Sequence, residues 1–115
     1  MIVDKPLIWL GSSLDDVRSF PAAARRLVGY ELRKVQQGLM PSNWKPMHTV
    51  GPGVNEIRIR TGAEYRVLYV TRFLEAVYVL HAFGKRTQWT SRTDIILARR
   101  RLGDLAGIRG RWKES

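Results

Sequence analysis

Cationic side chains recur on three successive predicted strands of this chain and could hold a phosphodiester. Arg58 and Arg60 are two residues apart in an alternating segment, so their side chains share one face of a strand. Arg66 lies on the next strand, and Lys85 and Arg86 follow the third. Such cations would bind a phosphate and stabilise the charge that develops when it is attacked. We interpret these five residues as a candidate nucleic-acid site.

The same alternation has a simpler interpretation. A strand with one buried face carries polar residues on the other, so the arginines could be ordinary solvent-facing residues. As a site residue on a polar strand face, Arg66 should be needed for activity, and its removal should change stability by only about 0.5 kcal/mol or less.

His81 and several aromatic residues could contribute to the same site. An imidazole titrates near neutrality and suits a general acid or base, but a core histidine bonded to the backbone is an equal alternative for His81. Trp44, Trp89 and Tyr69 could stack on unpaired bases, although aromatics in so small a chain are usually core residues. Trp89, in a polar segment, is the best candidate for exposure. The predicted RNA-binding residues are Lys45, Arg60, Trp89 and Arg92.

Other kinds of site have little support in the sequence. There is no cysteine, and two distant histidines without a carboxylate cluster do not predict a metal site. The sequence has no phosphate-binding glycine motif. Glycoside hydrolysis needs a pair of carboxylates, and no second acidic residue pairs with Glu56 in the predicted strands. We therefore expect neither a metal nor a cofactor.

The charge of the chain indicates a polyanionic partner. The chain has twenty basic residues, of which fifteen are arginine, and ten acidic residues, so its net charge is +10. Residues 85–115 carry nine bases and three acids. A basic third of a small domain favours nucleic acid as the partner. A solvated basic face and an acidic protein partner remain alternatives.

The 115 residues predict one domain, residues 1–115. We expect a strand over residues 7–10, a short helix from Ser12, a second helix after Pro21, a loop over residues 41–53, strands over residues 54–60, 65–72 and 76–83, and a last helix from Ser91 that frays from about residue 106. The prediction is an α+β fold in which an antiparallel meander has its helices on one face.

Both long helices show an apolar stripe. The inward positions predicted for the second helix are Ala24, Leu27, Val28, Leu32, Val35 and Leu39, and those for the last helix are Ile95, Ala98, Leu102 and Leu105. The outer surface of the last helix is expected to carry Arg92, Arg99, Arg100 and Arg101.

The apolar runs are far shorter than the ~20 residues that a membrane-spanning helix needs. The first residues do not resemble a signal peptide, because an acid stands at Asp4 and no small-residue cleavage site follows the short apolar stretch. We expect a cytoplasmic protein that does not associate with membranes.

Three segments together resemble a known family. They are residues 55–60 (NEIRIR) followed by residues 65–69 (YRVLY), residues 79–88 (VLHAFGKRTQ), and residues 98–102 (ARRRL) in the last helix. This pattern is similar to that of RelE/HigB-type toxins, and within them to the phage-derived Gp49-like branch. The resemblance covers about residues 5–105.

The resemblance implies the toxin of a type II toxin–antitoxin pair. Such toxins commonly enter the ribosomal A site and cut messenger RNA without a metal, by attack of a ribose 2′-hydroxyl on the adjacent phosphate. Arg58, Arg66 and Arg86 match basic positions of the family. Glu56 stands where the RelE branch has a lysine, and the last helix has no tyrosine. The base could therefore be Glu56, His81 or a lysine.

The implied partners are the ribosome, messenger RNA and a cognate antitoxin. We expect the antitoxin to be of the helix-turn-helix class and to form an oligomer with the toxin. Two other functions fit the same pattern. One is a ParE-like toxin that poisons DNA gyrase and cuts nothing; the other is a nucleic-acid-binding module without activity. A ParE-like protein does not need phosphate-binding residues at these positions, so the presence of Arg58, Arg66 and Arg86 favours the nuclease.

Overall fold

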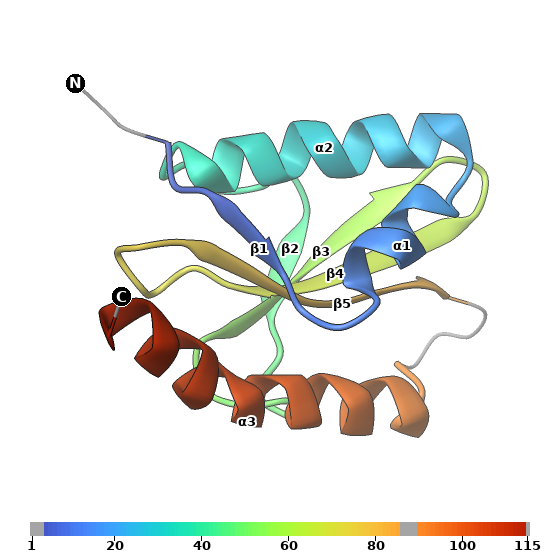
Figure 1. Ribbon diagram of the computed structural model, residues 1–115. Coiled ribbons are helices and arrows are strands. Elements are labelled where there is room, and N and C mark those ends of the chain that lie inside the picture. Colours follow the sequence, from blue (N-terminus) through green and yellow to red (C-terminus); the bar gives the residue numbers. More distant parts are fainter. Residues whose placement is uncertain (1–3, 86–89, 115) are drawn as a thin grey trace.

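A mixed sheet in the middle of the molecule has helices on both of its faces (Figure 1). The computed structural model describes residues 4–85 and 90–114. Its elements are β1 (Leu7–Trp9), α1 (Ser13–Arg18), α2 (Ala22–Gln36), β2 (Trp44–Pro46), β3 (Val54–Arg60), β4 (Glu64–Val70), β5 (Val77–Lys85) and α3 (Arg92–Glu114). The α+β fold expected from the sequence is confirmed.

The strands lie in the order β1-β5-β4-β3-β2. Strands β2 to β5 form an antiparallel meander, and β1 pairs with β5 in parallel. Gly62, with a φ of 88°, lies in the turn between β3 and β4, a conformation that glycine adopts without strain. This tight hairpin places Arg58 directly opposite Arg66.

Helices α1 and α2 cover one face of the sheet, and α3 covers the other (Figure 1). Ile57 and Val67 face α2, whereas Leu68 and Leu80 face α3. The expectation that all helices lie on one face is therefore wrong. The sequence carries the reason: β4 and β5 contain continuous apolar runs, and strands of this kind are buried on both faces.

The apolar stripe of α2 is narrower than its sequence predicts. Ala24, Val28 and Leu32 are buried against the sheet, whereas Leu27 and Leu39 are exposed. Leu27 lies at the edge of the stripe, since it is about 60° around the helix from Ala24. Leu39 follows Gln36, the last residue of the helix, and so is not on its inward face.

Two segments differ from the sequence prediction. The expected loop over residues 41–53 contains β2, a three-residue edge strand that pairs with β3; Pro46 is tolerated there because an edge strand leaves some of its N–H groups outside the ladder. Helix α3 continues to Glu114, past about residue 106, where the sequence predicts fraying. Arg109 binds Glu75 through two hydrogen bonds of 2.8 and 3.0 Å and holds that end of the helix.

Among the helices of residues 4–85 and 90–114, none has the length and hydropathy to cross a membrane.

Candidate functional site

Two arginines and a buried glutamate occupy the α3-facing side of the sheet. Alternation along β3 turns Ile57 toward α2, so Glu56 and Arg58 face α3, with Arg66 opposite on β4. Glu56 is 0% exposed, and its Oε1 lies 3.5 Å from Nε of Arg58 and 3.3 Å from Nε of Arg66. One carboxylate therefore holds two guanidinium groups side by side.

Arg66 is almost completely enclosed, with only 2% of its surface exposed. Its Nη2 donates to Oε2 of Glu64 at 3.1 Å. Burial lowers the pKa of its guanidinium, and the carboxylates of Glu56 and Glu64 oppose that shift. Its Nε is ion-paired with Glu56, whereas its Nη1 has no hydrogen-bond acceptor within residues 4–85 and 90–114. Buried donors normally have partners, so Arg66 retains N–H groups that an anionic oxygen could satisfy.

Lys85 completes the cationic group from β5. It is paired with Glu64 in the sheet register and is partly buried. Burial lowers the pKa of its ammonium group, and repulsion from Arg66 lowers that pKa further. Arg60 is exposed and forms a 2.9 Å ion pair with Glu64. The predicted residues Arg86 and Trp89 lie outside the described residues.

The expectation that the strand arginines face solvent is wrong for Arg66. The start of α3 lies over this side of the sheet, where Thr90 donates to Oε2 of Glu56 at 3.3 Å. Around Glu56 and Arg66 the polar face of β3 and β4 is therefore covered by protein, whereas Arg60 at the end of β3 is exposed. Glu64 was not identified from the sequence, although its place four residues after Arg60, across a tight turn, was a signal for a cross-strand ion pair.

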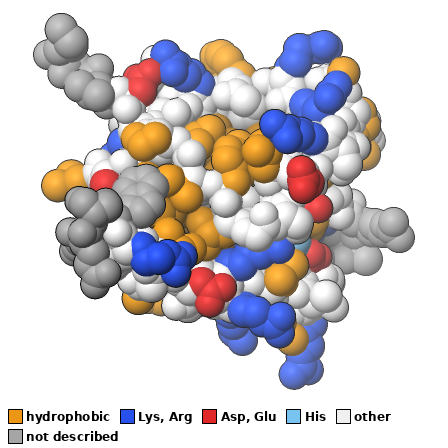
Figure 2. Space-filling model, viewed as in Figure 1, with side chains coloured by type: hydrophobic (Ala, Val, Ile, Leu, Met, Phe, Trp, Pro, Cys, Tyr) orange, Lys and Arg blue, Asp and Glu red, His pale blue; other side chains and the backbone are white. Residues whose placement is uncertain are grey.

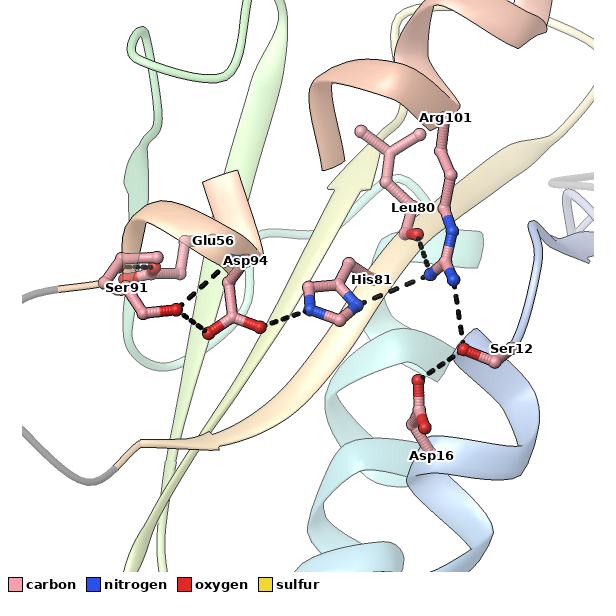
Figure 3. A network of polar contacts seen from close by, with 9 residues as sticks. Ser12, Asp16, Glu56, Leu80, His81, Ser91, Asp94 and Arg101 are labelled. Atoms are coloured by element: carbon pink, nitrogen blue, oxygen red, sulfur yellow. Dashed lines mark hydrogen bonds and ion pairs between the residues drawn. The ribbon is translucent and has the colours of Figure 1, made fainter. Parts of the chain in front are cut away.

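His81 lies on the same side of the sheet but is bound on both ring nitrogens (Figure 3). Its Nε2 lies 2.6 Å from Oδ1 of Asp94, and its Nδ1 lies 3.4 Å from Nη1 of Arg101. The side chain is buried, and its ring stacks on Phe83. This geometry favours the interpretation of His81 as a core histidine over that of a general acid or base.

The network around His81 extends to α1 (Figure 3). Arg101 donates to the carbonyl of Leu80 at 2.9 Å and to Oγ of Ser12 at 3.0 Å, and Ser12 donates to Asp16 at 2.9 Å. The expectation that Arg101 lies on the outer surface of α3 is wrong, since it is buried. The spacing contained the signal: Arg101 falls three residues after Ala98 and four before Leu105, on the buried stripe.

Two of the other predicted RNA-binding residues lie on elements that border Glu56. Lys45 is exposed on β2, opposite Glu56 in register, and Arg92 is exposed in the first turn of α3. Trp44 is partly buried opposite Ile57. The interpretation of Tyr69 as a base-stacking residue is wrong, because Tyr69 is buried in the core beneath α2; this burial raises its pKa to about 12.

Acidic, histidine and cysteine side chains do not gather into a group of three or more that could hold a metal ion in the part of the chain that the structure describes.

Comparison with models of known protein families gives a match over most of the chain. The model of the family described as phage-derived Gp49-like proteins matches residues 15–103. This span includes Glu56, Arg58, Arg66 and Lys85. Among curated proteins, no significant match is found.

Proposed function

The chain belongs to the phage-derived Gp49-like family, a family of RelE-like toxins of toxin–antitoxin systems, and from this premise we propose that it is a ribosome-dependent endoribonuclease of messenger RNA. Membership of the family implies a cognate antitoxin. We further propose that the chain acts in the cytoplasm on messenger RNA bound to the ribosome. Its antitoxin is of the helix-turn-helix class and forms an oligomer with the toxin.

In the proposed reaction a ribose 2′-hydroxyl attacks the neighbouring phosphorus. The O2′–P bond forms while the P–O5′ bond breaks, and the proton of the hydroxyl passes to a base. Solvent water donates a proton to the leaving 5′-oxygen, and the protonated base later returns its proton to solvent. The products are a 2′,3′-cyclic phosphate and a 5′-hydroxyl. The phosphorane formed on the way carries additional negative charge, which cations can stabilise.

Arg58 and Arg66 are assigned to this charge stabilisation. The observation that carries the assignment is the pairing of both guanidinium groups with one carboxylate. Arg58, whose side chain is 27% exposed, is the arginine that contacts the phosphate, and Arg66, which is 2% exposed, adds its positive charge beside it. Glu56 fixes the positions of both arginines through ion pairs of 3.3 and 3.5 Å. A preorganised donor of this kind costs little reorganisation during the reaction.

Lys85 is the candidate base. Glu56 is 0% exposed, and both ring nitrogens of His81 contact protein groups. The pKa of Lys85 is lowered, chiefly by burial, which increases the fraction of neutral amine that can accept a proton. Arg86 is retained as a further cation of the site on the basis of the sequence.

The test is cleavage of ribosome-bound messenger RNA with mapping of both product ends. We expect a 2′,3′-cyclic phosphate and a 5′-hydroxyl, and cleavage that persists in EDTA once ribosomes are kept intact with magnesium in small excess. A message with 2′-deoxyribose at the scissile position should be inert. Products with a 5′-phosphate, or cleavage of the deoxy message, would show attack by water and overturn the proposal.

A further inference from the structure

Large apolar side chains are exposed along α2 and directly after it. Leu27 and Tyr30 are 38% and 60% exposed on successive turns of the helix, and Leu39 and Met40, which follow the helix, are 57% and 54% exposed. These are four of the six exposed large hydrophobic residues in the described part of the chain. Exposed apolar residues that gather in one place indicate an interaction surface.

Lys34 links the helix to the loop that follows it. Its ammonium group lies 4.8 Å from the centre of the Tyr30 ring and donates to Oγ of Ser42 at 2.7 Å. The backbone N–H of Ser42 in turn donates to Oε2 of Glu31 at 2.8 Å, which holds the loop after α2 against the helix. We call the set Leu27, Tyr30, Lys34, Leu39 and Met40 the α2 surface.

Basic residues border the α2 surface on the solvent side of the helix, where Arg26 and Arg33 lie one turn before and after Tyr30. Arg25, Arg26 and Arg33 are exposed on the same helix, and Figure 2 shows lysine and arginine side chains along the upper part of the molecule, over α2. Arg33 is ion-paired with Asp4 at 2.6 Å, whereas Arg25 and Arg26 have no ion pair within the described ranges. The surface therefore combines apolar anchors with cations.

The α2 surface is separate from the arginine site. Helix α2 packs on the face of the sheet that carries Ile57 and Val67, and Glu56, Arg58 and Arg66 occupy the opposite face, under α3. A molecule bound to the α2 surface has the sheet between it and Arg66.

We propose that the α2 surface binds an acidic amphipathic segment of the cognate antitoxin. Such a segment buries aliphatic residues against Leu27, Leu39 and Met40 and places carboxylates near Arg26, which lies one helical turn before Tyr30. The inference rests on the toxin–antitoxin assignment of the family and does not depend on nuclease activity.

Charge and chemistry decide between this occupant and two others. A second copy of the chain would bring two basic helices together, and like charges across an interface are unfavourable. RNA would use the cations but leave the aliphatic side chains without a partner, because RNA offers phosphates, sugars and base faces. An acidic amphipathic helix satisfies both features of the surface.

The absence of cysteine from the sequence allows a direct test by single-cysteine protection. Tyr30→Cys and Met40→Cys variants are labelled with a maleimide, alone and after co-expression with the product of the neighbouring gene. Ile96→Cys, 45% exposed on α3, is the matched control. We expect the complex to slow labelling of the two α2 variants at least about tenfold and to leave the control unchanged. Protection of Ile96→Cys alone, or no complex at all, would overturn the proposal.

Two further measurements separate the other occupants and the proposed function. Slower labelling of Tyr30→Cys in the isolated chain at high concentration, or on addition of RNA, would assign the surface to a second copy or to nucleic acid and overturn the proposal. Tyr30→Asp should raise the Kd for the neighbouring gene product at least about tenfold, as for a buried tyrosine anchor, with Ile96→Asp as control. Binding is measured without RNA cleavage, so a chain that binds through α2 but cuts no RNA would refute only the nuclease.

Discussion

At the scale of the residue, Arg66 combines a positive charge with almost complete burial. A charge removed from water is retained only when opposite charges compensate it. Glu56 and Glu64 provide that compensation at 3.3 and 3.1 Å. Arg66 and Glu56 thus depend on each other for the stability of the fold as well as for the site.

Arg66→Ala should consequently destabilise the protein, in contrast to the small effect expected for a solvent-facing arginine. The substitution leaves Glu56 buried with only Arg58 as counter-charge, and breaking a buried pair costs about 3–5 kcal/mol. Urea denaturation of both proteins measures the loss. Arg60→Ala, which removes an exposed pair with Glu64, is the control and should cost at most about 1 kcal/mol. Equal losses for the two variants would contradict the burial of Arg66.

His81→Gln tests whether the imidazole takes part in the reaction. The hydrogen bonds of His81 to Asp94 and Arg101 indicate a structural role, so the substitution should cost about 1–3 kcal/mol of stability through partners left unsatisfied. Cleavage by the folded variant at low temperature should stay within about threefold of the parent rate, since no step of the proposed reaction uses the ring. If the folded variant instead cleaves on the order of 10²–10⁴ times more slowly, the loss has the size of a general acid–base contribution. His81 would then be a catalytic residue.

The sequence predicts which side of a strand a residue faces better than it predicts what covers that side. The period of two correctly separates Ile57 and Ile59 from Glu56 and Arg58. It says nothing of where α3 will lie, and the position of α3 decides whether Glu56 and Arg66 are exposed. Burial of a polar face is a tertiary property, so the ion-paired arginine site could be predicted only as a group of cations.

At the scale of the element, α3 is attached to the sheet near both of its ends. Near the start of α3 Asp94 binds His81, and Arg101 binds the same ring from the middle of the helix. Near its end Arg109 binds Glu75, and its guanidinium lies 3.7 Å from the centre of the Phe73 ring. The early contacts position the part of the helix beside the arginine site, and the late contacts keep the last turns on the β4–β5 connection.

The attachment at Arg109 should weaken in acid. Hydrogen bonding by Arg109 lowers the pKa of Glu75 from its ordinary 4.5 to about 2. A lowered pKa in the folded state adds stability that is fully present above about pH 4.5 and is lost as the pH falls toward 2. Glu75 and Arg109 are partly exposed, so solvent screening keeps this contribution small.

Denaturation of the parent and of Arg109→Ala between pH 7 and pH 2 measures this contribution. The parent should be more stable near neutrality, and the difference should shrink below about pH 4. Arg111→Ala, which removes an exposed arginine of the same helix, is the control and should show no such convergence. A difference that stays constant over the whole range would contradict the assignment to Glu75.

The elements with strong local signals were predicted from the sequence, and the others needed tertiary information. Strand β3 has the predicted bounds, because its alternation begins and ends sharply. Strand β2 was missed because its three residues carry no periodicity and include Pro46. The exposure of Leu27 also could not be foreseen, since it depends on which part of the apolar stripe meets the sheet.

At the scale of the whole molecule, the sheet separates two surfaces with different chemistry. The α3 side carries the ion-paired arginines, and the α2 side carries exposed apolar residues among cations. The net charge of +10 favours encounter with anionic partners at both surfaces. We propose that RNA binds on the α3 side of the sheet and the antitoxin on the α2 side.

Production of the chain without its antitoxin should arrest bacterial growth by stopping translation first. The proposed reaction destroys messenger RNA on the ribosome, so incorporation of labelled methionine should fall within minutes, before incorporation of labelled thymidine declines. Lys85→Ala is the matched variant, and it should fold because Lys85 is only partly buried. Loss of the base should slow the fall in methionine incorporation on the order of 10²-fold or more. The gyrase-poisoning alternative gives the opposite order, because damage to DNA halts replication while existing messages are still translated. Thymidine incorporation that falls first, with arrest unchanged in Lys85→Ala, would replace the ribonuclease with the gyrase poison.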